Sequence, residues 1–361
     1  MKRKIILSVF AITLGICSCG NPVKTKIALM TKLEAGSAVG RSEINATKIF
    51  IEKYKANDID VVFYDDAWNP DKTIEAYKKL RRDGIDIIIT SHTSACAVGI
   101  KEMINHDRVF TLVTGATTNL LSGNDDYIFR NIQDVDLEQK SIASYMNRKG
   151  YKNLLVLQDM DNEAYTTPAR SSFQKYYVAP VYFYEISISK VDSDYIERLF
   201  RNRTFSALYL LIGGYKVTAG TIAQLVRKMS PSIPIYYTPW MKSPELIDTA
   251  GLSLKGSIIP SHYPPSGENI AVDSYISLHK EKYGFIPTFI SLNVYSALQI
   301  LYEAISNGNK TPDSIKKYIL HKRKFHTDFG DLVFNDFGDV EKDLFFTEIT
   351  GETIDEIIKN F

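Results

Sequence analysis

The chain has 361 residues, of which 45% are apolar, and its 43 basic and 42 acidic residues give a net charge of +1. This balance lacks the basic excess typical of nucleic-acid-binding proteins, so we expect no nucleic-acid partner. A chain of this length and apolar content can bury more than one core, which favours two globular domains.

The N-terminus has the pattern of an export signal. Basic residues at positions 2–4 precede the apolar run of residues 5–16, which is too short to span a bilayer. The run ends in "ICSC", which resembles a bacterial lipobox, and its second cysteine, Cys19, follows a small residue. We therefore predict a lipoprotein signal peptide over residues 1–18, lipidation of Cys19, and a tether over residues 19–25. An ordinary cleaved signal is the alternative.

Removal of this signal leaves 40 basic against 42 acidic residues, a net charge of −2, and leaves Cys96 as the one cysteine besides Cys19. Without an intrachain disulfide, stability must come from apolar cores. The sequence has no second long apolar segment, so we expect attachment to the membrane by lipid alone. The expected location is the cell envelope, facing the periplasm or the exterior.

Strand and helix patterns alternate from residue 26 onward. The strands are continuously apolar, as in a parallel sheet covered on both faces, and the helices repeat apolar residues at a spacing of three or four. The predicted strands of this first series are 26–31, 60–66, 85–90 and 109–115, and the predicted helices are 42–57, 69–84 and 94–107.

The alternation starts again after residue 135. The predicted helices are 136–150, 166–177, 193–202 and 218–229, and the predicted strands are 153–159, 181–186, 206–214, 233–240 and 256–263. Two such series predict an α/β fold of two doubly wound, Rossmann-like lobes, joined by several crossovers that suit a hinge.

The C-terminal part differs from both series. Two or three long helices are expected within residues 267–323. The stretches "GDLVFNDFGDV" (330–340) and "DLFFTEITG" (343–351) look like a closing hairpin with its turn near Gly338 and Asp339.

Across nearly its whole mature length the chain resembles the type I periplasmic binding proteins, specifically the LivJ-like branched-chain amino-acid receptors of ABC transporters. The order and spacing of five stretches carry this resemblance. They are "YDDAWNPDKTIEAYKKLRRDGID" (64–86), "SHTSAC" (91–96), "VTGATTN" (113–119), "IGGYKVTAGTIAQLVRKM" (212–229) and "GDLVFNDFGDV" (330–340).

The resemblance implies two lobes with a ligand in the cleft between them. It places lobe 1 over residues 26–137 and 263–342, and lobe 2 over residues 138–262 and 343–361. Physical chemistry agrees, because ligands of open parallel sheets bind beyond the carboxyl ends of the strands, where the following helices offer unpaired N–H groups.

The stretch "ITSHTSACAVG" (89–99) could place Ser94 as a nucleophile beside the base His92. It has no G-x-S-x-G elbow, and adjacent residues in such a turn rarely point the same way. Capping of the following helix is one alternative, and binding of a ligand carboxylate by the same hydroxyl and N–H groups is another. The resemblance assigns the ligand contacts of this lobe to Ser94, Ala116, Thr117 and Thr118.

In the second lobe the resemblance assigns a ligand contact to Tyr215, with a core tyrosine as the alternative. The amino-acid receptors place a glutamate of "GPE" against the ligand ammonium, but here the matching stretch is "TPW", with Trp240. A buried ammonium without an anionic partner costs several kcal/mol, so a plain aliphatic amino acid is not expected. Trp240 could instead stack on a planar ligand or bind a cation. Asp161 or Glu163 could supply the missing charge, unless they lie in a solvated loop.

Enteric members of the family carry a disulfide at the positions that match Trp68 and Thr93, and both cysteines are absent here. We expect Cys96 to be a small buried residue. His92 and His262 show no metal-ligand spacing with other donors, so we predict no metal and no other cofactor.

These observations favour a monomeric, lipid-anchored solute-binding protein without enzymatic activity. It would deliver a small polar ligand, amino-acid-like or another carboxylate, to an ABC permease. A lipoprotein of the same fold that acts through a protein partner, as activators of peptidoglycan synthases do, is one alternative, and a filled cleft would favour it. A sensory ligand receptor and an enzyme of unknown type are the others.

Overall fold

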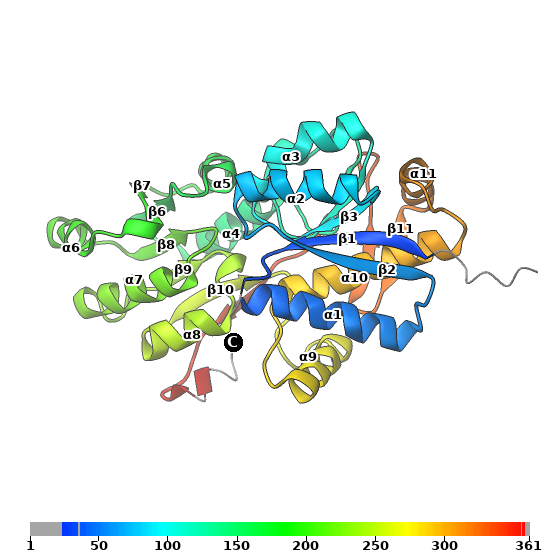
Figure 1. Cartoon of the computed structure of the whole chain (residues 1–361). Coiled ribbons are helices and arrows are strands. Elements are labelled where there is room, and N and C mark those ends of the chain that lie inside the picture. The colour runs from blue at the N-terminus through cyan, green and yellow to red at the C-terminus, as the bar shows by residue number, and fades with distance from the viewer. Residues whose placement is uncertain (1–23, 35–36, 355, 358–361) are drawn as a thin grey trace, which may run out of the picture.

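The computed structural model describes residues 24–34, 37–354 and 356–357 and contains two α/β lobes (Figure 1). In that view the first lobe is on the right and the second on the left. The predicted signal peptide and Cys19 lie outside the described residues. Within those residues, none of the helices combines the length and the apolar character that a membrane crossing needs.

The first lobe contains a parallel sheet of five strands in the order β2-β1-β3-β4-β5. The strands are β1 (Thr25–Thr31), β2 (Ile59–Asp65), β3 (Ile87–Thr90), β4 (Phe110–Val113) and β5 (Ile128–Arg130), and the first three helices are α1 (Ala38–Tyr54), α2 (Pro70–Arg82) and α3 (Ser94–Asp107). The sequence did not predict β5, because three residues are too few to show a period.

The second lobe contains a sheet of six strands in the order β13-β10-β9-β8-β6-β7. Its strands are β6 (Leu154–Asp159), β7 (Val181–Ile186), β8 (Ala207–Leu211), β9 (Ile235–Tyr237), β10 (Ser257–Ser261) and β13 (Phe345–Glu348). Its helices are α4 (Val135–Lys149), α5 (Glu163–Tyr176), α6 (Ser193–Asn202), α7 (Lys216–Met229) and α8 (Pro244–Ala250). All neighbours in this sheet are parallel except β13, which runs antiparallel to β10.

After β10 the chain returns to the first lobe. Three helices follow, α9 (Ile270–Tyr283), α10 (Phe289–Ser306) and α11 (Pro312–Lys322), and then the strands β11 (Lys324–Thr327) and β12 (Gly330–Val333). Helix α10 contributes a long series of buried residues to the core beneath the first sheet, where it packs beside α1 (Figure 1).

The predicted closing hairpin is wrong. Strand β12 pairs with β11, whereas β13 pairs with β10 of the other lobe. A turn does occur near Gly338, closed by a bridge between Phe334 and Val340. The pairing differs because an exposed edge of the second sheet offers β13 a partner that lies far away in the sequence.

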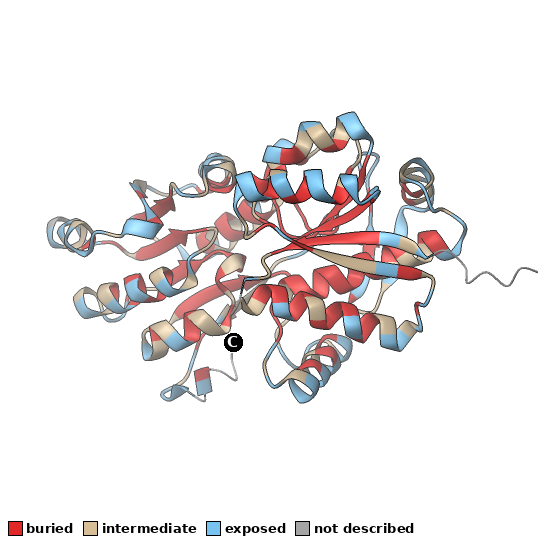
Figure 2. Cartoon of the chain, in the orientation of Figure 1, coloured by how far each residue is buried: buried red, intermediate tan, exposed pale blue. Residues whose placement is uncertain are grey.

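The central strands of both sheets are buried on both faces, as the continuous apolar strand patterns predict (Figure 2). Separate clusters of apolar side chains cover the two faces of each sheet, and the exposed polar sides of the helices face solvent. The described chain crosses between the lobes three times, through residues 131–134, 262–269 and 334–344. The predicted lobe boundaries stay predictions.

Arg130, at the end of β5, is among the largest fully buried side chains of the described residues. Its guanidinium donates to Asp339 Oδ1 at 2.6 and 2.8 Å and to the carbonyl of Thr118 at 3.0 Å. Arg130 therefore fixes the turn near Gly338 and the loop after β4 to the same strand end.

Arg130→Met should lower the free energy of unfolding by about 3 kcal/mol, because a buried ion pair that loses one partner leaves the other charge unsatisfied. Chemical denaturation measures the effect. Arg201→Met is the matched control, since the Arg201–Glu197 pair is exposed and its loss should cost about 0.5 kcal/mol. Equal losses in the two variants would contradict the role given to Arg130.

Candidate functional site

Two adjacent cavities lie between the lobes, at the carboxyl ends of the strands. The inner cavity has a volume of about 20 Å³ and the outer cavity about 680 Å³. Residues of both lobes line each cavity, and four of these residues line both: Trp68, Thr93, Asn162 and Gly213. The two cavities therefore form one candidate site with a nearly filled inner end and a roomy outer end.

Ser94 lies in the wall of the inner cavity and is 3% exposed. The helix cap is made by Thr93, whose hydroxyl accepts from the N–H of Cys96 at 3.4 Å. Ser94 Oγ accepts from the N–H of Thr118 at 3.3 Å and donates no hydrogen bond to any described residue. The hydroxyl proton of Ser94 is therefore available to a ligand beside the N-terminus of α3.

The loop after β4 packs tightly against the loop after β3. A side chain at Gly115 would place Cβ 2.3 Å from the carbonyl oxygen of Ser91, so only glycine allows this approach. Three neighbouring predicted contacts, Ala116, Thr117 and Thr118, are buried and are not among the residues that line the two cavities. Their contact with a ligand stays a prediction.

His92 is engaged with Asp66. His92 Nδ1 and Asp66 Oδ2 are 2.7 Å apart, and both side chains are fully buried. Asp66 Oδ1 also accepts from the N–H of Trp68 at 3.0 Å. This pair joins the loop after β2 to the loop after β3.

The serines do not use His92 as a base in the described structure. Ser91 Oγ donates to Glu43 Oε2 at 2.8 Å, and no hydrogen bond joins His92 to Ser91 or Ser94. Burial raises the pKa of Glu43 to about 8, against the lowering effect of the hydrogen bond from Ser91. Glu43 is therefore largely protonated at neutral pH in the folded chain.

Trp240 nearly fills the inner end of the site. Its ring centroid lies 5.5 Å from Phe289, 5.9 Å from His262 and 6.2 Å from Tyr165. It packs against apolar clusters of both lobes. The place where the amino-acid receptors are expected to hold an anionic glutamate is therefore occupied by an aromatic ring.

Tyr215 and Asp161 line the outer cavity. Tyr215 is 52% exposed and precedes α7 with a φ of 53°. The Asp161 carboxylate accepts from Ser187 Oγ at 2.9 Å and from the N–H of Ser189 at 2.7 Å, which lowers its pKa although burial raises it. Glu163 is not among the lining residues of either cavity.

The outer cavity also contains charged residues that the sequence did not single out: Lys32, Glu34, Asp159, Lys216 and Glu245. The Lys216 ammonium lies 5.4 Å from the ring of Trp68, which is a cation–π contact between the lobes. Burial raises the pKa of Asp159 to about 6. The position of Asp159 at a strand end could have indicated its place, but no sequence pattern indicates Glu245.

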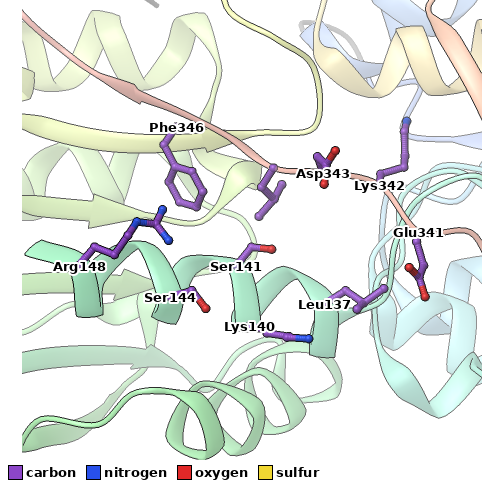
Figure 3. Close-up of a pocket in the computed structure, with 10 residues that line it drawn as sticks. Leu137, Lys140, Ser141, Ser144, Arg148, Glu341, Lys342, Asp343 and Phe346 are labelled. Carbon is purple, nitrogen blue, oxygen red and sulfur yellow. The ribbon is translucent and has the colours of Figure 1, made fainter.

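A third cavity, of about 410 Å³, lies between α4 and residues 341–346 (Figure 3). Phe346 points toward α4, whereas the Lys342 side chain points away from it. Cys96 is a buried free thiol, as expected. The described residues contain no group of three or more His, Cys, Asp or Glu side chains that could hold a metal ion.

The family model described as periplasmic binding protein matches residues 25–353. The chain therefore belongs to the periplasmic binding protein family. It is 21% identical to the "Leu/Ile/Val-binding protein homolog 3" of Brucella melitensis, with 96% of each chain covered. It is 22% identical to the Leu/Ile/Val-binding protein of Escherichia coli K12, covering 80% of this chain and 78% of the relative.

Solved structures show the same fold. The leucine-binding protein LivK of Thermotoga maritima superposes with a TM-score of 0.82 at 20% identity, covering 91% of this chain and 96% of that one. LivJ of Streptococcus pneumoniae, bound to isoleucine, gives 0.81 at 18% identity, covering 91% and 96%. A solute-binding protein of Rhodopseudomonas palustris, bound to 3,4-dihydroxybenzoic acid, gives 0.77 at 16% identity, covering 90% and 93%.

Glu43→Gln should make the chain's stability less dependent on pH. Because the pKa of Glu43 is raised from 4.5 to about 8 on folding, its contribution is fully present below pH 4.5 and is lost as the pH rises toward 8. The glutamine variant should gain on the order of 4 kcal/mol relative to the parent between these limits. Urea denaturation at pH 5, 6.5 and 8 measures this gain.

Glu52→Gln, an exposed change on the same helix, is the control and should follow the parent at each pH. A constant difference between the Glu43 variant and the parent would show that Glu43 does not titrate as described.

Proposed function

We propose that this chain is a lipid-anchored solute-binding protein that captures a small polar, carboxylate-bearing ligand between its lobes and delivers it to an ABC permease. The observation that carries the proposal is the two-part cavity, which both lobes line at the carboxyl ends of their strands. Membership of the periplasmic binding protein family supports a receptor rather than an enzyme. Residues 1–18 and Cys19 supply the export and the anchor.

The ligand carboxylate would bind at Ser94 and the N-terminus of α3, where a free hydroxyl proton and the helix end favour an anion. The rest of the ligand would extend into the outer cavity, past Trp68, toward Tyr215. Trp240 supplies an aromatic wall where the amino-acid receptors carry a charge. A planar or aromatic carboxylate fits this lining better than a plain aliphatic amino acid.

The amino-acid and benzoate-type ligands of the structural relatives are compatible with this range of carboxylates. Sequence identities below 25% support a shared fold but not a shared ligand. The choice among these carboxylates therefore depends on the residues that line the cavities of this chain. The lobe boundaries at residues 137, 262 and 342 form part of the proposal, because the cleft lies between the segments that they separate.

A second candidate function is that of a lipoprotein of the same fold that acts through a protein partner. The small inner cavity favours it, because Trp240 occupies the space in which a ligand of the family would be expected. The larger outer cavity favours solute binding, since its volume lies in the usual range for small-molecule sites.

Thermal denaturation of residues 20–361 against amino acids, amides, aliphatic acids, benzoates and betaines tests the choice. A ligand at one hundred times its dissociation constant adds about 2.7 kcal/mol, which should raise the melting temperature by about 2 °C or more. We expect a carboxylate to produce this shift. The absence of any shift would favour the protein-partner function, and tight binding of leucine or valine would contradict the role given to Trp240.

Ser94→Ala should weaken the carboxylate that the panel identifies by about 10-fold to 100-fold, since a hydrogen bond to a charged group contributes about 1.5–3 kcal/mol. Isothermal titration calorimetry measures the affinity. Ser141→Ala, in the third cavity, is the control and should bind like the parent. Unchanged affinity in the Ser94 variant would remove Ser94 from the site.

A further inference from the structure

Each of the three crossovers between the lobes contacts Asn293 of α10, whose side chain is fully buried. From the first crossover, Asn131 Nδ2 donates to the main-chain carbonyl of Asn293 at 2.7 Å. From the second, the Tyr263 hydroxyl donates to Asn293 Oδ1 at 2.7 Å. From the third, Lys342 Nζ lies 3.4 Å from the same oxygen. Asn293, a residue of the first lobe, thus contacts all three crossovers of the hinge.

Asn293 also contacts the candidate site. Its Nδ2 donates to the carbonyl of Thr114 at 2.9 Å, directly before Gly115 and the loop that packs on Ser91. The other end of that loop is held by the N–H of Val135, which donates to the carbonyl of Thr117 at 2.7 Å. The hinge and the loop beside Ser94 are therefore connected by hydrogen bonds at both ends of the loop.

The ammonium of Lys342, at the place where the crossovers contact Asn293, is poorly solvated. Burial lowers the pKa of Lys342 to about 8. Its side chain points away from α4 (Figure 3), and its ammonium lies 4.6 Å from the ring of Tyr263. His262 is buried beside it, and burial, followed by the charge of Lys342, lowers the pKa of His262 to about 3. A hydrogen-bond acceptor for the Lys342 ammonium, such as Asn293 Oδ1, is therefore important to the hinge.

Several buried polar atoms of the same crossovers have no hydrogen-bond partner among the described residues. They are Asn131 Oδ1, both side-chain polar atoms of Gln133 and both ring nitrogens of His262. Each buried polar group without a partner costs about 1–3 kcal/mol. The polar groups of the crossovers thus do not all favour the arrangement seen here, in which the lobes touch through Trp240 and Phe289. The contacts of Tyr263 and Lys342 with Asn293 Oδ1 are among those that do.

We propose that Asn293 is a positioning residue that sets the balance between closed and open lobes. Its hydrogen bonds hold the crossovers in the arrangement in which the lobes touch. The inference rests on the proposed function, because the affinity for a ligand held between the lobes depends on how readily the lobes close. An equilibrium between two lobe arrangements shifts by the free energy that distinguishes them, so loss of these bonds must lower the closed population.

The test measures lobe distances without any ligand. Spin labels at Lys72→Cys and Lys190→Cys, exposed sites on the two lobes near the carboxyl ends of their strands, report the distance distribution by double electron–electron resonance. The buried Cys96 stays in place. Asn293→Leu keeps the approximate size of the side chain and removes its side-chain contacts with Tyr263, Lys342 and Thr114, while the main-chain bond from Asn131 stays. We expect the ratio of closed to open populations to fall by at least about three-fold.

Gln299→Leu is the matched control on the same helix. Gln299 contacts no crossover residue: its side chain donates to the Tyr54 hydroxyl at 2.7 Å and accepts from the N–H of Asp328 at 3.0 Å. It should lower stability and leave the distance distribution unchanged. Tyr263→Phe removes only the hydrogen bond from the Tyr263 hydroxyl to Asn293 Oδ1. If the Asn293 variant does not fold, the distance distribution of the Tyr263 variant tests the proposal.

An unchanged distribution in the folded variants, or an equal shift in the Gln299 control, would overturn the proposal. Because no ligand is added, that result would leave the solute-binding function intact. Conversely, the inter-lobe distances could change in the Asn293 variant while no ligand of the panel raises the melting temperature. That result would support the positioning role of Asn293 and count against solute capture.

Discussion

The parallel direction of the strands is the constraint on which the remainder of this structure depends. Because neighbouring strands of each central sheet run the same way, with β13 as the exception, the helices that follow them begin at one edge. The two lobes place those edges against each other, and the cavities form there. The N-termini of α3 and α7, which come from different lobes, therefore face one space. Ser94 and Lys216, the first residues of these helices, owe their positions to this geometry.

Within that space, the two ends differ in charge. Trp240 closes the inner end through contacts with both lobes, whereas the charged residues gather in the outer cavity. Beneath the site, the Asp66–His92 pair and the Ser91–Glu43 bond hold the loops of the first lobe, and Arg130 holds the loop after β4. Binding groups that are fixed in advance lose less entropy when a ligand arrives. The hinge contacts of Asn293 extend this connected set to the crossovers.

Much of the fold could be predicted, because strands buried on both faces leave a continuous apolar pattern that local reasoning detects. Strand β5 was missed since it has three residues, and β13 was paired wrongly since its partner β10 is distant in sequence. The site was predicted in part. Ser94, Trp240, Tyr215 and Asp161 do line the two cavities, while Asp159, Lys216 and Glu245 were not anticipated. Of these three, only Asp159 has a position, at the end of an apolar strand, that could have indicated its place.

The sequence by itself determined the alternation of strands and helices, the two-lobe α/β class and the family resemblance, because these depend on local periodicity and on the order of short motifs. It also indicated the exchange of a charged residue for Trp240. Only the tertiary structure decided that Trp240 nearly fills the inner cavity, that His92 pairs with Asp66 rather than with a serine, and that three crossovers meet at Asn293. These features join residues far apart in the chain, and such contacts form only when long-range packing brings the segments together.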